Sequence, residues 1–196
     1  MEKIIDYYLF ANSPYTYLGH RRFGAIARAA GARIRIKPVD AAKIFPISGG
    51  LPLAKRAPQR QAYRLVELKR WRDHVGVTLN LQPKHFPVAT EAAARLIIAA
   101  DESSPQTAFD LAGRVLAAVW AEERDIADEA TLLALAGSDG AQLLERSKSA
   151  AVLERYDALT QEAIERQVFG APTYFYRDEP FWGQDRLDFL ERALAR

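Results

Sequence analysis

Apolar and polar residues follow a strand-like pattern at both ends of the chain and a helical pattern in the middle. Residues 3–10 are rich in isoleucine and aromatic side chains, which predicts a strand buried on most sides. Ser13 then precedes a proline, Pro14, in the arrangement that begins many helices, so a helix is expected over residues 14–30. Cationic residues alternate with isoleucine over residues 32–37, which predicts a second strand with one face toward water.

Between residues 40 and 166 the strand pattern disappears and helical periodicity takes over. Residues 43–58 hold three prolines and two adjacent glycines, so a long loop is expected there. In the helix that follows, Leu65, Leu68, Trp71 and Val75 are expected to face inward. The expected helices lie at about 58–75, 91–100, 105–122, 128–136, 141–147 and 150–168, with a proline-rich connector over 81–88.

Strand chemistry returns after Gly170. Residues 173–176 and 181–182 flank a polar segment and are expected to form a hairpin, which an amphipathic helix over 184–194 follows. This order predicts an α/β chain with a thioredoxin fold and a large all-helical insertion after the second strand. The expected domains are a thioredoxin-like domain of residues 1–39 and 167–196, and an inserted helical domain of residues 40–166.

Composition narrows the function without defining it. The 196 residues include 27 Lys and Arg and 25 Asp and Glu, a net charge of +2, and the two signs interleave along the chain, so nucleic acid is not an expected partner. Cysteine is absent, which excludes disulfides, cysteine nucleophiles and cysteine-ligated metals, and no metal site is expected. The first residues do not resemble an export signal and no apolar run could span a membrane, so a cytoplasmic protein is expected.

The candidate chemistry lies where the first strand meets the first helix, because the free N–H groups and the positive dipole end of a helix stabilise an anion there. A redox protein with this fold would carry cysteines at the two outer positions of residues 13–16, and here both, Ser13 and Thr16, are hydroxyls. Disulfide exchange is excluded, but a hydroxyl can still donate a hydrogen bond to the thiolate of a bound ligand such as glutathione. The alternative is that Ser13 is only a helix cap.

A second candidate feature is the segment before the third strand. Ala171 and Pro172 precede that strand, and in this fold the proline faces the beginning of the first helix. The backbone N–H and C=O of Ala171 are therefore expected to pair with a peptide-like ligand, as an added short strand would.

Three segments together resemble one known family. They are residues 13–19 (SPYTYLG), residues 154–173, which end in VFGAPT, and residues 182–187 (WGQDRL), with Tyr63 and Arg70-Trp71 between them. The chain is similar over its whole length to the 2-hydroxychromene-2-carboxylate isomerases, a family in the kappa-class glutathione transferase branch of the DsbA-like thioredoxin superfamily.

The resemblance implies a homodimeric, glutathione-dependent isomerase of aromatic hydrocarbon catabolism, whose substrate is a small aromatic carboxylate. In this family the glutathione thiolate adds to 2-hydroxychromene-2-carboxylate, the ring opens, a bond rotates, and glutathione leaves to give trans-o-hydroxybenzylidenepyruvate. The family's catalytic serine falls on Ser13 and its cis-proline on Pro172. The contact to the cysteinyl backbone of glutathione falls on Ala171, and the contacts to its γ-glutamyl end fall on Gln184 and Asp185.

The chain also departs from the family pattern. A usual lysine is replaced by Arg60, which keeps a cation for the glycyl carboxylate of glutathione. Three usually polar positions hold Phe10, Gly50 and Ala89, and these changes leave the exact substrate open. The candidates for binding an anionic substrate are Lys43, Arg60 and His85. Two other functions stay open, a kappa-class-like glutathione transferase and a non-catalytic thioredoxin-fold binding protein.

Overall fold

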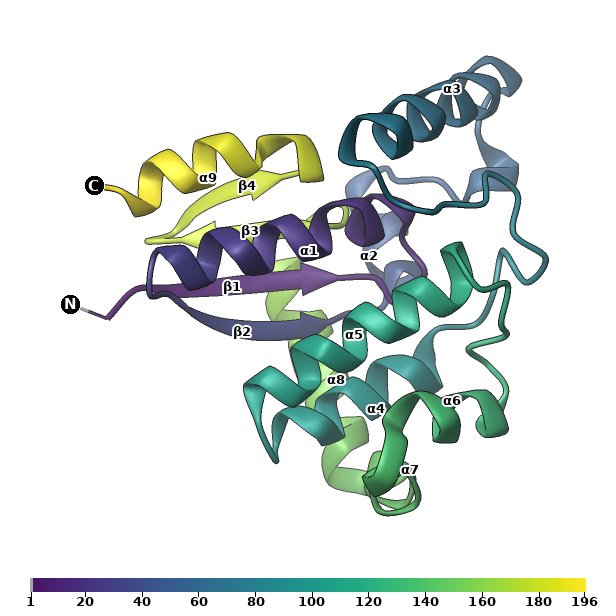
Figure 1. Cartoon of the computed structure of the whole chain (residues 1–196), viewed down its shortest axis with the longest axis vertical. Coiled ribbons are helices and arrows are strands. Elements are labelled where there is room, and N and C mark those ends of the chain that lie inside the picture. Colours follow the sequence, from purple (N-terminus) through teal and green to yellow (C-terminus); the bar gives the residue numbers. More distant parts are fainter. Residues whose placement is uncertain (1) are drawn as a thin grey trace.

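The computed structural model describes residues 2–196 and contains a mixed four-stranded sheet with helices on both faces (Figure 1). The strands are β1 (Ile4–Leu9), β2 (Arg33–Pro38), β3 (Thr173–Tyr176) and β4 (Glu179–Trp182), and their order across the sheet is β2-β1-β3-β4. β2 is parallel to β1, whereas β3 is antiparallel to β1 and β4 is antiparallel to β3. This topology, with helices inserted between β2 and β3, confirms the predicted thioredoxin-like fold.

The N-terminal β1–α1–β2 unit follows the local signals in the sequence. Helix α1 (Pro14–Ala29) begins directly after Ser13, whose extended backbone and side-chain oxygen cap the first turn. The chain leaves the helix through Gly31, which has a φ of 61°, a left-handed conformation that costs glycine little. The second strand then lies one residue later than predicted.

The loop expected over residues 43–58 was wrong. The structure has helix α2 (Ala41–Ser48) there, followed by a short 3-10 turn, η1 (Leu53–Lys55). The Asp40 carboxylate accepts a hydrogen bond of 2.7 Å from the Ala42 amide, which caps the helix, and Gly49 ends it with a φ of 75°. Pro46 lies inside the helix, although its missing N–H costs one backbone hydrogen bond.

The helical insertion continues largely as the periodicity predicts, with most helix ends within one or two residues of the expected positions. Its core is α4 (Glu91–Asp101), which contacts β2 and neighbouring helices of the insertion, and the alanines of α4 allow this close packing. One continuous cluster of buried side chains joins these helices to the sheet, and the domain division expected at residues 39/40 and 166/167 stays a prediction. The helices are α3 (Pro58–Val75), α4 (Glu91–Asp101), α5 (Pro105–Trp120), α6 (Glu129–Ala136) and α7 (Gly140–Ser147), with the 3-10 turn η2 (Gly137–Asp139) before α7.

The C-terminal part differs from the expectation in two details. Helix α8 (Ala150–Glu165) ends three residues early, near Gln167, which has a φ of 58°. The hairpin turn is also tighter than expected, because Arg177 and Asp178 both have positive φ and form a two-residue turn. The expected last helix divides into the 3-10 turn η3 (Gln184–Arg186) and α9 (Leu187–Leu194).

Alternating side chains give the two faces of the sheet different chemistry. Tyr7 and Tyr174 stack with ring centroids 5.2 Å apart on the face that α1 covers, and Phe23 of α1 packs against both rings. Tyr8 and Phe175 lie on the other face, toward α8, which runs behind the sheet in Figure 1. Both layers of the fold are therefore anchored by aromatic residues of β1 and β3.

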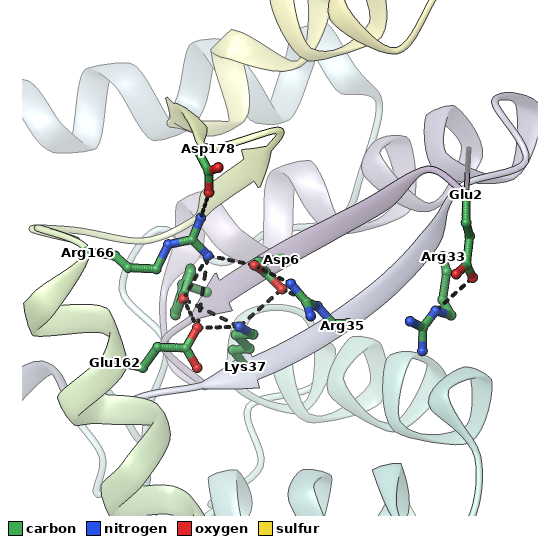
Figure 2. Close-up of polar contacts among 9 residues, drawn as sticks. Glu2, Asp6, Arg33, Arg35, Lys37, Glu162, Arg166 and Asp178 are labelled. Atoms are coloured by element: carbon green, nitrogen blue, oxygen red, sulfur yellow. Dashed lines mark hydrogen bonds and ion pairs between the residues drawn. The ribbon is translucent and has the colours of Figure 1, made fainter.

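The face toward α8 also carries a network of charged side chains (Figure 2). The Asp6 carboxylate accepts hydrogen bonds from Arg35 (2.5 and 2.8 Å) and from Arg166 (2.6 Å), and Lys37 Nζ lies 3.1 Å from it. These contacts connect β1 and β2 to the end of α8 and to the β3–β4 turn. We call the whole group the Asp6 cluster: Asp6, Tyr8, Arg35, Lys37, Glu162, Arg166 and Asp178.

Burial and charge act in opposite directions on Asp6. Burial disfavours the ionised carboxyl, but the hydrogen bond from Arg35 and the charge of Lys37 outweigh it, so the pKa of Asp6 lies below its ordinary value of 3.8. Glu162 behaves in the same way. Its pKa is lowered because Lys37 and Tyr8 donate hydrogen bonds that outweigh its burial.

None of the helices within residues 2–196 combines the length and the apolar character that crossing a membrane requires.

We predict that Asp6→Asn lowers the free energy of unfolding by about 3 kcal/mol at pH 7, because it leaves the buried Lys37 without one of its two carboxylates. The lowered pKa means that Asp6 stabilises the fold fully above pH 4 and loses this effect as the pH falls through the folded-state pKa. Urea unfolding of both proteins at pH 7 and pH 3 measures the difference, which should shrink at pH 3.

Asp178→Asn is the matched control, because Asp178 also pairs with Arg166 but its side chain is 98% exposed. It should change the free energy of unfolding by less than about 0.5 kcal/mol. A difference between wild type and Asp6→Asn that is the same at both pH values would contradict the prediction.

Candidate functional site

Ser13 lies at the carboxyl end of β1 and caps α1. Its Oγ accepts a hydrogen bond of 3.2 Å from the Thr16 amide and donates one of 3.3 Å to the Ala171 carbonyl. The residue is 7% exposed, and the neighbouring Tyr15 amide has no hydrogen-bond partner within residues 2–196. The N-terminus of α1 thus offers one hydroxyl that faces the segment before β3, and one free amide.

The segment opposite Ser13 contains the Ala171–Pro172 peptide bond, which is cis, as the resemblance implies. The Pro172 carbonyl accepts a hydrogen bond of 2.9 Å from the Gly183 amide, which connects this segment to the chain after β4. The N–H of Ala171 forms no hydrogen bond in the described chain, and Ala171 is half-buried. A free backbone donor therefore lies beside Ser13, where an added peptide strand could pair with it.

The η3 turn closes the site on the side of β4. Gln184 is 3% exposed and packs against Gly19 of α1 so closely that a Cβ at position 19 would lie 2.7 Å from the Gln184 Cβ. Asp185 is exposed and pairs with Arg186 at 2.8 Å. Contacts thus run from Ser13 through Pro172 to η3, and they bring five of the six predicted site residues to one end of the sheet: Ser13, Ala171, Pro172, Gln184 and Asp185.

Arg60, the sixth predicted residue, lies apart from these contacts. It is exposed in the first turn of α3, and its side chain has no ion-pair partner among residues 2–196. The structure records no contact between Arg60 and Ser13. Its proposed role therefore depends on a ligand that reaches from the end of β1 to α3.

Lys43 and His85, the other candidates for an anionic substrate, lie next to carboxylates. Lys43 Nζ is 2.7 Å from Asp157 at the surface, and this contact raises the pKa of Lys43. His85 Nδ1 lies 3.8 Å from Asp125. Each carboxylate competes with an incoming anion, so neither residue offers a free cation.

Sequence reasoning missed a buried cation in α3. Arg64 is 8% exposed, whereas Leu65, which we expected to face inward, is only half-buried. The Arg64 guanidinium lies over the rings of Phe86 (5.3 Å) and Trp120 (5.6 Å). The signal was present, because Arg64 stands four residues before Leu68 and so extends the buried stripe, but the sequence pattern alone assigned Arg64 no role.

Among residues 2–196, no side chain forms a hydrogen bond with Ser13 that would let it act as a general base. The nearest histidine in sequence, His20, is buried between Tyr7, 3.1 Å from its Nδ1, and the carbonyl of Phe109, 3.0 Å from its Nε2. Burial lowers the pKa of His20 to about 4, so its ring is neutral near pH 7. Without a base to remove its proton, the Ser13 hydroxyl is suited to donate a hydrogen bond rather than to attack a substrate.

Two surface hollows lie away from Ser13. One borders the Asp6 cluster and is lined mainly by charged side chains that already pair with one another. The other lies between β4 and α9, where Trp182 and Phe189 are exposed. Neither is lined by Ser13 or Ala171, so the candidate site is assigned by its chemistry.

Comparison with known proteins agrees with this geometry. Residues 4–195 match the model of the family described as the DSBA-like thioredoxin domain. A 2-hydroxychromene-2-carboxylate isomerase of Pseudomonas putida is 36% identical over 98% of this chain and 95% of the relative, and one of Sphingobium xenophagum is 31% identical over 99% of both. The solved structure of a selenomethionyl 2-hydroxychromene-2-carboxylate isomerase superposes with a TM-score of 0.82 at 32% identity, covering 98% of this chain and 95% of the other.

The matches cover nearly the whole length at more than 30% identity, and the solved structure superposes closely, which establishes the family. The chain belongs to the DsbA-like thioredoxin family and, within it, to the family of the 2-hydroxychromene-2-carboxylate isomerases.

Proposed function

We propose that this protein is a glutathione-dependent isomerase that interconverts 2-hydroxychromene-2-carboxylate, or a related aromatic carboxylate, and its ring-opened product. One observation carries the proposal. The Ser13 hydroxyl caps α1 and faces the Ala171 carbonyl before Pro172, in a chain that has no cysteine of its own. A thioredoxin fold that contains no cysteine is suited to use a thiol that a bound ligand supplies.

The residues around Ser13 fit glutathione. The unpaired N–H of Ala171 is suited to the cysteinyl backbone. Asp185 would bind the γ-glutamyl ammonium in place of Arg186, which now occupies its carboxylate, and Gln184 would offer its amide beside it. Arg60 would bind the glycyl carboxylate at the opposite end of the tripeptide.

When bound, glutathione supplies the sulfur nucleophile that adds to the substrate and later leaves it. Ser13 then donates its single proton to that sulfur instead of to Ala171, and gives up a hydrogen bond that is long at 3.3 Å. The Thr16 amide keeps the Ser13 oxygen in place during this exchange. It donates its own proton to that oxygen, so this hydrogen bond does not depend on where the hydroxyl proton of Ser13 points. The N-terminal end of α1 adds a favourable potential for the anionic sulfur, which lowers the pKa of the thiol.

Two alternatives use the same site. A glutathione transferase would use the same activated thiol on an electrophile, and a binding protein would hold glutathione without activating it. Conversion of 2-hydroxychromene-2-carboxylate, followed by absorbance with and without glutathione, tests the isomerase directly. Conversion that requires glutathione and consumes none supports the isomerase, whereas a stable glutathione adduct identifies the transferase. The expected homodimer and the expected cytoplasmic location stay predictions.

We predict that Ser13→Ala lowers glutathione-dependent turnover by roughly one to two orders of magnitude and changes the affinity for glutathione far less. The reason is that a hydrogen bond to a charged acceptor contributes about 1.5–3 kcal/mol, here mainly while the sulfur is anionic. Steady-state kcat and calorimetric binding of glutathione measure the two quantities separately.

Ser104→Ala is the matched control, since Ser104 also precedes a proline and caps α5 through the Thr107 amide. Both variants should lose about 1 kcal/mol of stability through the lost cap. Only Ser13→Ala should lose turnover, and an unchanged kcat in that variant would reduce Ser13 to a helix cap.

We predict that Arg60→Ala and Asp185→Ala each raise the KM for glutathione and leave kcat nearly unchanged, because both residues would contact parts of glutathione remote from sulfur. Both are exposed, so each effect should be about 1 kcal/mol, or roughly fivefold. Glutathione monoethyl ester, which masks the glycyl carboxylate, should bind wild type more weakly than glutathione does and bind Arg60→Ala almost equally well.

Lys69→Ala, which removes another exposed cation of α3, serves as the control and should leave both ligands unaffected. If Arg60→Ala keeps the full preference for glutathione over the ester, Arg60 is a solvated surface residue.

A further inference from the structure

Arg64 is a buried charge that has no partner in the described chain. It lies in the middle of α3 with 8% of its surface exposed, and within residues 2–196 its side chain forms neither an ion pair nor a hydrogen bond. Its neighbours are the rings of Phe86 and Trp120, which contact the guanidinium through their faces. This environment is unusual, because buried charges in proteins are ordinarily paired.

Packing alone does not account for an arginine at this position. Burial lowers the pKa of Arg64, the nearby Tyr15 offsets part of this effect, Arg56 lowers the pKa further, and no carboxylate raises it. The two aromatic faces compensate part of the desolvation, but an apolar side chain of similar size would contact the same rings without that cost. The guanidinium is therefore expected to bind an anion that the protein itself does not supply.

The position of Arg64 connects it to the candidate site. Trp120, one of the two rings beneath it, donates a hydrogen bond of 3.2 Å from Nε1 to the carbonyl of Asn12, the residue before Ser13. Tyr15, in the first turn of α1, is close enough to interact electrostatically with Arg64. Trp120 thus contacts both the guanidinium and the turn that carries Ser13.

The guanidinium of Arg64 is not fully enclosed. Within residues 2–196, four side-chain polar atoms are enclosed and have no hydrogen-bond partner: Thr16 Oγ1, Arg95 Nε, Tyr174 OH and Tyr176 OH. No nitrogen of Arg64 is among these enclosed atoms. The nitrogens of Arg64 have no partner either, so they keep contact with solvent through the small exposed fraction of the side chain.

The local charges also favour an anion. Arg56 lies close to Arg64, and Arg60 is one helical turn before it on the same face of α3, about 6 Å along the axis. The nearest acid on this helix, Glu67, is held by Arg70 at 3.1 Å. The surroundings of Arg64 therefore carry more positive than negative charge.

We propose that Arg64 binds the carboxylate of the aromatic acid that enters beside Ser13. The neighbouring Tyr15 and Phe86, both partly exposed, suit an aromatic ring, and the planar guanidinium suits a carboxylate in bidentate geometry. Arg60 and Arg64 of α3 would then bind different anions, Arg60 the glycyl end of glutathione and Arg64 the substrate. This inference rests on the proposed function, since it names the group that holds the substrate of that site.

The test uses two probes that do not react. The trans-2-hydroxycinnamate ion carries a carboxylate, and its neutral amide, trans-2-hydroxycinnamamide, has nearly the same shape without the charge. With saturating glutathione present, calorimetry should show that wild type binds the acid about tenfold to a hundredfold more tightly than the amide. Arg64→Met should abolish this preference, Arg64→Lys should keep part of it, and Arg64→Met should still prefer glutathione to its monoethyl ester.

Thermal unfolding of the ligand-free variants separates binding from packing. Arg64→Met should melt at the same temperature as wild type or higher, because it replaces an unpaired buried charge with an apolar side chain of similar length. Arg70→Met is the control, since Arg70 lies on the same helix with 64% of its side chain exposed and should change neither the melting temperature nor any affinity. A lower melting temperature of Arg64→Met with the acid preference intact would overturn the proposal in favour of a structural role.

Loss of the preference for glutathione over its ester, with the acid preference retained, would also overturn it, because Arg64 would then hold the glycyl carboxylate. These measurements involve no turnover, so they fail independently of the proposed function. A protein that lacks isomerase activity can still show an acid preference that depends on Arg64, and an active isomerase can lack it.

Discussion

The antiparallel pairing of β1 with β3 is the constraint on which the site depends. In the observed register Tyr8 lies opposite Thr173, so the residues that follow β1 meet the residues that precede β3. Ser13 and Ala171, 158 residues apart in sequence, form a hydrogen bond for this reason. The stacked rings of Tyr7 and Tyr174 hold the register, because a slip of one residue would turn one ring to the opposite face of the sheet.

The two faces of the sheet stabilise the fold by different interactions. The face toward α1 is aromatic and buries His20 as a neutral ring, whereas the face toward α8 gathers the Asp6 cluster. The aromatic side chains and the Asp6 cluster both lie along the strands, whereas the candidate site lies beyond the carboxyl end of β1. The charges of the Asp6 cluster are thus kept away from Ser13 and from the N-terminal end of α1.

Local signals were sufficient to predict β1, α1 and most of the later helices, because capping residues, prolines and hydrophobic periodicity mark them directly. They failed for α2, where Pro46 suggested a loop although Asp40 and Gly49 delimit a helix. They failed again at Arg64, because composition cannot tell which charged residue of an amphipathic helix is buried; that depends on Phe86 and Trp120, which come from distant segments. Ser13 and Pro172 could be proposed from short motifs, but their contact is a product of strand pairing.

The close approach of Gly19 and Gln184 has a consequence for how this scaffold can diversify. α1 and η3 can approach this closely only because residue 19 has no side chain, since any Cβ at position 19 would clash with Gln184. Changes elsewhere in η3 can alter what the turn recognises, but they cannot bring it nearer to α1 than the two backbones already are. Substitutions at this end of the site can therefore change the polarity or charge of its side chains, such as the charge of residue 185. The spacing between α1 and η3 stays the same as long as position 19 is glycine.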